Sequence, residues 1–220
     1  MDPRVLSVNV GVPREIEWLG RRVTTAIWKS PVEGRLAVLG VNVTGDDQAD
    51  RSVHGGPDKA LYAYAREDAE WWEVELGRSI DLGGFGENLT LAGVDVSGAV
   101  VGERWEAGSA LLEVSEPRAP CFKLGARMGD SRFPPRFAAA GRPGAYLRIV
   151  REGEIGAGDS VRRVHRPEHG ITVGEVATIY HHDHGRAALL LDIPELAESW
   201  RDWARTLLKA AAKLSRPHRL

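Results

Sequence analysis

Cysteine is almost absent from this chain, and its scarcity excludes a fold held together by disulfides. The 220 residues contain a single cysteine, Cys121, which has no partner within the chain. One unpaired thiol is typical of a protein kept in a reducing compartment. The start of the sequence, Met1 to Arg4, leads directly into a strand-like pattern and lacks the apolar core of a secretion signal. We therefore expect a cytoplasmic protein.

Long apolar runs, strong net charge and glycine motifs for nucleotides are also missing. No apolar run approaches the ~20 residues that span a bilayer. The net charge of −2 and the pI of about 6.4 do not predict binding to nucleic acid or to a membrane surface. The sequence has no Gly-x-Ser-x-Gly motif of a serine hydrolase and no Gly-x-Gly-x-x-Gly motif for NAD or a flavin. A redox reaction would therefore need electrons from a separate reductase.

Glycine and proline are frequent by contrast, with 25 and 12 residues spread along the chain. Between residue 4 and about residue 165 they separate short β-like segments, a pattern that favours a barrel or a sandwich. We expect strands at residues 5–10, 22–28, 35–38, 61–64, 102–105 and 110–114, and a late hairpin formed by residues 145–150 and 160–164. A first helix is predicted for residues 67–76, where Trp71, Trp72 and Leu76 fall on one side.

The pattern changes after residues 166–170 (Arg-Pro-Glu-His-Gly). Thr172 and Glu175 have the spacing of a helix capping box, and apolar residues follow them at helical intervals. We expect about three short helices between residues 171 and 215. The sequence therefore predicts a mainly β domain over residues 1–166 and a small helical domain over residues 167–220.

The surroundings of Cys121 favour a presented, reactive thiol. Residues 117–121 (Pro-Arg-Ala-Pro-Cys) follow a strand-like segment, and the two prolines stiffen the backbone there. The guanidinium of Arg118 would favour the thiolate, which is the form that attacks electrophiles or binds metal. The alternative is a buried, inert cysteine that only fills space. The residues alone leave these two interpretations about equally open.

Two glycine-rich segments are further candidates for ligand binding. In residues 54–60 (His-Gly-Gly-Pro-Asp-Lys-Ala), the glycines permit close approach of the backbone, and His54 and Lys59 could hold an anion. In residues 83–90, Asn88 could donate and accept hydrogen bonds at the edge of a heterocycle. Ordinary turns account for both segments as well. A hydrolase that pairs Cys121 with His54 also stays open, because sequence does not show whether the two side chains meet.

The three motifs occur together and in order. Residues 54–60, then 86–89 (Gly-Glu-Asn-Leu), then 117–121 resemble the MOSC family, which is named after the C-terminal domain of molybdenum-cofactor sulfurases. The resemblance is to the YiiM-like branch and covers nearly the whole chain. It implies a MOSC-type β-barrel with a few helices, followed by a small C-terminal three-helix domain. Phe122 stands where the family often has Trp, a departure that removes no ligand.

The resemblance implies a molybdenum cofactor (molybdopterin), with Cys121 as the catalytic residue and the thiolate ligand to the metal. The residues implied to hold the pterin and its phosphate are His54, Lys59, Asn88 and Arg118, together with Glu87, Gly55 and Gly56 of the same motifs. A soft thiolate suits a redox metal, and Arg, Lys and His suit a phosphate. Pyridoxal phosphate is a second ligand kept open for this site.

The activity implied by the resemblance is the reduction of N-hydroxylated compounds, such as hydroxylaminopurine bases, with electrons from a separate reductase. A homodimer is kept open. Two other functions are weighed beside it. One is a sulfur carrier with a persulfide on Cys121, or a carrier of the molybdenum cofactor. The other is a small β-barrel binding module whose cysteine is inert.

Overall fold

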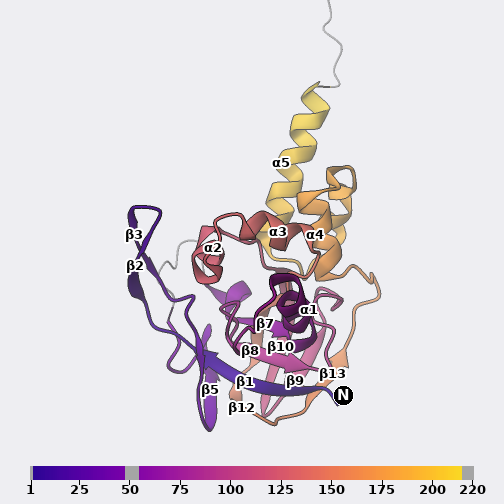
Figure 1. Ribbon diagram of the computed structural model, residues 1–220. Coiled ribbons are helices and arrows are strands. Elements are labelled where there is room, and N and C mark those ends of the chain that lie inside the picture. Colours follow the sequence, from indigo (N-terminus) through magenta and orange to yellow (C-terminus); the bar gives the residue numbers. More distant parts are fainter. Residues whose placement is uncertain (1, 48–54, 215–220) are drawn as a thin grey trace, which may run out of the picture.

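A computed structural model describes residues 2–47 and 55–214 (Figure 1). Its centre is an eight-stranded sheet in which all neighbouring strands are antiparallel except β7 and β8. In spatial order the strands are β13 (Val161–His165), β9 (Arg104–Ala107), β10 (Ala110–Pro117), β11 (Ala145–Arg151), β7 (Leu61–Ala65), β8 (Leu89–Ala92), β1 (Arg4–Val10) and β4 (Ser30–Pro31).

The central strand β7 is buried on both faces because each face of the sheet has its own apolar core. Leu61 and Ala63 pack into the larger core, which the sheet shares with the C-terminal helices. Tyr62 and Tyr64, which alternate with them, pack into a second, aromatic core. This alternation follows from the two-residue period of a strand. It places the Tyr62 side chain on the face of the sheet where the candidate site lies.

The sheet curls, but it does not close into the barrel that we expected. β13 and β4 form its two edges. The curl brings β1 against the turn before β13, where the amide of Val5 donates to the carbonyl of Asp159 at 2.8 Å. One isolated bridge, between Arg4 and Ser160, continues this contact. The described residues therefore form an open, curled sheet.

The prediction that residues 145–150 and 160–164 pair as a late hairpin is wrong. After β11 the chain forms β12 (Gly153–Gly156), which pairs with β5 (Arg35–Leu39) in a three-stranded sheet completed by β6 (Asn42–Val43). β13 then pairs with β9 at the far edge of the large sheet. Gly153 permits this path, because a Cβ there would lie 2.5 Å from the carbonyl carbon of Ser109.

A separate hairpin projects from the side of the molecule (Figure 1). It consists of β2 (Arg14–Trp18) and β3 (Arg21–Thr25). The strand expected at residues 22–28 therefore ends at Thr25, and the residues after it turn back to line the candidate site.

Three helices pack near the aromatic core. α1 (Arg66–Leu76) was predicted; it buries Trp72 and ends at Gly77, whose φ of 63° suits glycine. α2 (Phe122–Met128) and α3 (Phe133–Ala139) were not predicted. Strands make up 32% and helices 30% of the described residues, so the protein is mixed and sheet-rich rather than mainly β as expected.

The C-terminal part contains the three helical segments that the sequence predicts. They are α4 (Val173–His181), the 3-10 helix η2 (His184–Asp192) and α5 (Glu198–Leu214). The capping box of Thr172 and Glu175 is confirmed. Residues from all three segments belong to the same core as the sheet, so a domain boundary near residue 167 stays a prediction. No helix in the described ranges has the length and apolarity to cross a membrane.

Candidate functional site

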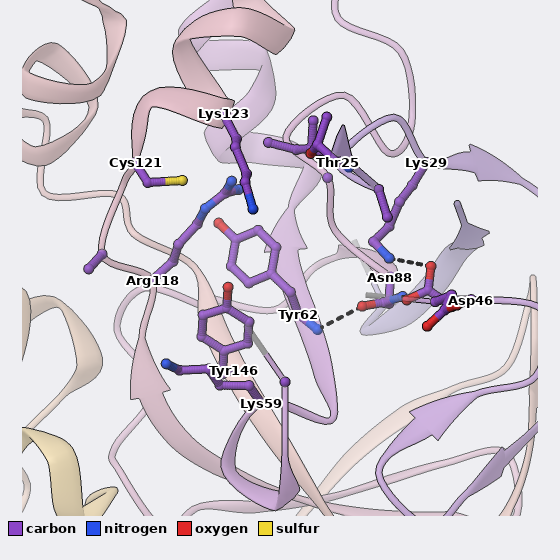
Figure 2. Close-up of a pocket in the computed structure, with 16 residues that line it drawn as sticks. Thr25, Lys29, Asp46, Lys59, Tyr62, Asn88, Arg118, Cys121, Lys123 and Tyr146 are labelled. Carbon is purple, nitrogen blue, oxygen red and sulfur yellow. Dashed lines mark hydrogen bonds and ion pairs between the residues drawn. The ribbon is translucent and has the colours of Figure 1, made fainter. Parts of the chain in front are cut away.

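The candidate site is a pocket at the end of β10, where the chain passes through residues 118–120 to Cys121. β10 extends to Pro117, three residues beyond the predicted strand; its register with β11 shifts between Val114 and Glu116, and proline is tolerated at such a bulge. Figure 2 is a close-up of the pocket. The side chains labelled there are Thr25, Lys29, Asp46, Lys59, Tyr62, Asn88, Arg118, Cys121, Lys123 and Tyr146.

Cys121 is a free, partly exposed cysteine at the rim of this pocket. It is the residue before α2, and its carbonyl accepts a hydrogen bond from the amide of Leu124 at 3.0 Å. The rigid residues 118–120 hold the thiol between the end of β10 and the start of α2. In Figure 2 the sulfur points toward the side chains of Arg118 and Lys123. This placement favours a presented thiol over one that fills the core.

Arg118 is buried, with 7% of its surface exposed. Its guanidinium donates to the carbonyl of Phe85 and lies 4.9 Å above the centre of the Tyr62 ring. Burial alone would lower the pKa of Arg118, but Tyr62, Tyr146 and Cys121 outweigh it and raise the pKa above its usual value. The positive charge beside Cys121 is therefore permanent.

Two tyrosines form the floor of the pocket. The rings of Tyr62 and Tyr146 lie 5.2 Å apart, and the hydroxyl of Tyr62 donates to the carbonyl of Pro143 at 2.8 Å. Burial raises the pKa of Tyr146 to about 12 and the pKa of Tyr62 still further. Both phenols therefore stay neutral near pH 7 and provide flat, apolar surface with a hydroxyl at its edge.

The side of the pocket opposite Cys121, here called the far wall, is a network of hydrogen bonds around Asp46 (Figure 2). One carboxylate oxygen accepts hydrogen bonds from Lys29 and, at 2.8 Å, from the amide of Gly11. The other accepts from the side-chain nitrogen of Asn88 at 2.9 Å. Burial lowers the pKa of Lys29, and the neighbouring Asp46 opposes this effect. Lys29 and Asp46 thus neutralise one another.

Asn88 ties this network to the sheet. Its amide nitrogen also donates to the carbonyl of Asn9 at 3.2 Å, and its amide oxygen accepts from the backbone of Tyr62 at 3.1 Å. Both amide hydrogens therefore point to protein acceptors. Asn88 lines the pocket, but its hydrogen bonds hold Asp46 and strand β7 in place.

The near wall, around Cys121, is cationic. Lys59 lies on the 3-10 turn η1 (Pro57–Lys59), and its ammonium is 3.4 Å from a carboxylate oxygen of Glu116. Lys123 lies on α2 and points into the pocket beside Arg118 (Figure 2). Three basic side chains and one thiol thus surround the same space.

Comparison with known proteins decides the family. The model of the MOSC domain matches residues 50–162. The chain belongs to the MOSC family. The chain is 36% identical over 200 residues to the uncharacterized protein YflK of Bacillus subtilis, covering 90% of each. It is 34% identical over 191 residues to protein YiiM of Escherichia coli, covering 84% of each.

Two further relatives are a protein of known structure and a fungal protein with a functional name. The crystal structure of YiiM from Geobacillus stearothermophilus superposes with a TM-score of 0.78 at 32% identity, covering 94% of this chain and 99% of that one. A protein of Gibberella moniliformis named "Reductase" is 32% identical over 201 residues, which are 89% of this chain and 36% of the relative. The chain therefore spans about a third of the length of this fungal relative.

The donor set of the MOSC site fits that cofactor. A soft sulfur donor stands at the rim, and the cationic groups of Lys59, Arg118 and Lys123 surround the adjoining space. Thiolate is a ligand for redox metals, whereas Lys and Arg bind phosphate. The neutral phenols of Tyr62 and Tyr146 supply flat surface for a planar ring system. These groups match the metal, the phosphate and the pterin respectively.

The structure brings together most of the residues that the sequence singles out. Cys121, Arg118, Lys59, Asn88 and Gly55 line the pocket. Their roles toward a cofactor stay predictions. His54 lies outside the described residues.

Glu87 and Gly56 are the predicted site residues that the structure places elsewhere. The Glu87 carboxylate is buried beneath the loop, where it accepts from the amides of Gly83 and Phe85 at 2.8 and 2.9 Å. Its burial raises its pKa. Gly56 precedes η1 with a φ of 86°, a conformation that favours glycine. In the described structure both residues shape loops rather than line the pocket.

Sequence reasoning missed Lys29, Tyr62, Lys123 and Tyr146, and it gave Asp46 no role. Lys29 and Asp46 are far apart in sequence from Cys121 and have no motif of their own. Tyr62 and Tyr146 lie on strands predicted for other reasons, and their positions next to one another follow from the pairing of β7 with β11. Lys123 belongs to α2, a helix that was not predicted.

Proposed function

We propose that this MOSC protein binds a molybdenum cofactor through Cys121 and reduces N-hydroxylated compounds with electrons from a separate reductase. The observation that supports it is the position of the free thiol, at the rim of a pocket surrounded by three basic side chains. The name of the fungal relative supports a reductive reaction.

Each residue of the pocket has a role that suits its chemistry. Cys121 would provide the protein's sulfur ligand, and Lys59 and Lys123 would hold the phosphate. Arg118, which is held by its hydrogen bond to the carbonyl of Phe85, would keep the region beside the sulfur positive. When bound, the molybdenum centre would supply the electrons for breaking the N–O bond.

The experiment is to measure molybdenum and pterin in protein purified without oxygen from a host that makes the cofactor. We expect near-stoichiometric molybdenum in the wild type and background levels in Cys121→Ala. Ser199→Ala, a small change in the neighbouring cleft, is the matched control and should retain the metal. Equal molybdenum in the wild type and in Cys121→Ala contradicts the proposal.

A second candidate function is supported by the exposure of Cys121, which faces two adjoining clefts and is accessible to a sulfur donor. In that case the protein would carry a persulfide on Cys121 or deliver the cofactor. Intact-mass analysis of the same samples distinguishes this function from the proposed reductase. A wild type that lacks molybdenum and whose mass is raised by one sulfur atom on Cys121 favours the sulfur carrier.

A further inference from the structure

A second cleft, of about 730 Å³, adjoins the cofactor pocket. The two share five lining residues, among them Cys121, which therefore lies between them; the others are Lys59, Ala119, Lys123 and Tyr146. The C-terminal helices form the opposite wall of this cleft with aromatic side chains. The ring centre of Tyr180 lies 4.9 Å from that of Trp200 and 4.8 Å from that of Trp203. Such walls suit a planar, aromatic group.

One carboxylate, Glu116, lines this aromatic cleft. It is buried, with 2% of its surface exposed. One of its oxygens pairs with the ammonium of Lys59 at 3.4 Å. The other oxygen, Oε2, is buried and has no well-aligned hydrogen-bond partner among the described residues, although the nearby indole of Trp200 still lowers the pKa of this carboxyl. Because buried polar atoms nearly always have partners, this oxygen is suited to hold a proton or to meet a ligand.

The surroundings of Glu116 poise it for proton transfer near neutral pH. Burial raises the pKa of Glu116 to about 7, although Lys59 and Trp200 oppose this effect. Asp58, on the same turn as Lys59, adds to the increase. A group with a pKa near the working pH is the most effective general acid.

We propose that Glu116 donates the proton to the oxygen that leaves when the N–O bond of a substrate in the aromatic cleft is broken. This inference rests on the proposed function. The overall change is R–NH–OH plus two electrons and two protons giving R–NH₂ and water. The electrons come from the separate reductase. One proton passes from Glu116 to the departing oxygen, and the other reaches the nitrogen from solvent.

Lys59 completes this arrangement. Its ammonium stabilises the carboxylate that remains after the proton has left, and solvent then restores the proton. The titratable groups that face Glu116 are Lys59 and Asp58 from η1 and Tyr146 from β11. The neighbouring Trp200 of α5 has no charge. Because Glu116 must be protonated to act, the rate should fall as the pH rises through about 7.

The test uses molybdenum-loaded protein, a hydroxylaminopurine as the substrate and a reduced viologen dye as the electron source. A single turnover isolates the cleavage step. Glu116→Gln should slow it roughly 100-fold and remove its pH dependence, because an amide cannot donate the proton in this way. Glu116→Asp keeps a titrating carboxyl and should keep a pH dependence. All three proteins should contain equal molybdenum.

A measurement without cofactor gives an independent readout. In the native protein Glu116 takes up its proton at a higher pH than in the unfolded chain, so the wild type should lose stability as the pH rises from about 5 to 7. Glu116→Gln should lack that loss, and its melting temperature should rise relative to the wild type over this range. Cys121→Ala should keep the wild-type slope.

The outcomes separate the two proposals. A loaded, active wild type whose Glu116→Gln variant turns over within about twofold of it, with the same pH profile, overturns the role of Glu116. An identical dependence of melting temperature on pH in both proteins also counts against it. A wild type without molybdenum or activity overturns the proposed function itself, and the role of Glu116 with it.

Discussion

The two walls of the pocket differ in whether they present a free reactive group. On the far wall, Asp46 has partners on both oxygens, and Lys29 and Asn88 are held by it. On the near wall, Cys121 is free and partly exposed. The comparison indicates that the far wall is a scaffold that fixes the shape of the pocket, whereas the near wall presents the free thiol of Cys121.

The largest effect is expected from the near wall. Cys121→Ala should abolish reduction of a hydroxylaminopurine while leaving the fold intact, because the side chain is small and lies at the rim. Turnover assays and circular dichroism check this. A variant that turns over as fast as the wild type would show that the two walls do not differ in the way described.

The far wall should respond in stability instead. Asp46→Asn leaves the buried ammonium of Lys29 without its counter-charge and should cost about 3 kcal/mol of folding free energy in a urea titration. Lys29→Met combined with Asp46→Asn should recover part of that loss, since no buried charge is then left alone. A loss of less than about 0.5 kcal/mol in Asp46→Asn would contradict the scaffold role.

Lys123→Gln should show the opposite pattern to Asp46→Asn. Removing one phosphate-binding charge should weaken retention of the cofactor roughly tenfold, while the free energy of unfolding changes by less than about 0.5 kcal/mol. The measurement is the molybdenum that stays bound after extended dialysis, compared with Lys209→Gln on α5 as a control. Equal retention in the two variants would remove Lys123 from the binding set.

The smallest effect concerns neither wall. Thr172→Ala removes the cap of α4 and should cost about 1 kcal/mol of stability. Its molybdenum content should equal that of the wild type. This variant separates a loss of stability from a loss of binding, and a reduced metal content in it would mean that the pocket is sensitive to stability in general.

The sequence predicts the residues of the near wall better than those of the far wall. Cys121, Arg118 and Lys59 belong to short motifs with unusual glycine or proline contexts. Lys29 and Asp46 are ordinary residue types, and the fold alone brings them together. Their pairing depends on how the chain returns after β3 and β6, which local patterns do not specify.

The fold shows the same division between local and long-range information. The capping box of Thr172 predicts α4 because the signal lies within four residues. α2 contains Gly125, and α3 has Pro134 and Pro135 in its first turn, so both segments resemble loops in composition. Prolines in a first turn were the available signal for α3. The prediction of a late hairpin failed because β12 pairs with β5, which is more than a hundred residues away in sequence.

The most direct test of the central claim is X-ray absorption at the molybdenum edge, on loaded wild type and on Cys121→Ser. The account predicts that the variant either loses the metal or shows one molybdenum–sulfur bond fewer than the wild type. A loaded Cys121→Ser protein with the same sulfur coordination as the wild type would contradict the claim that Cys121 holds the metal.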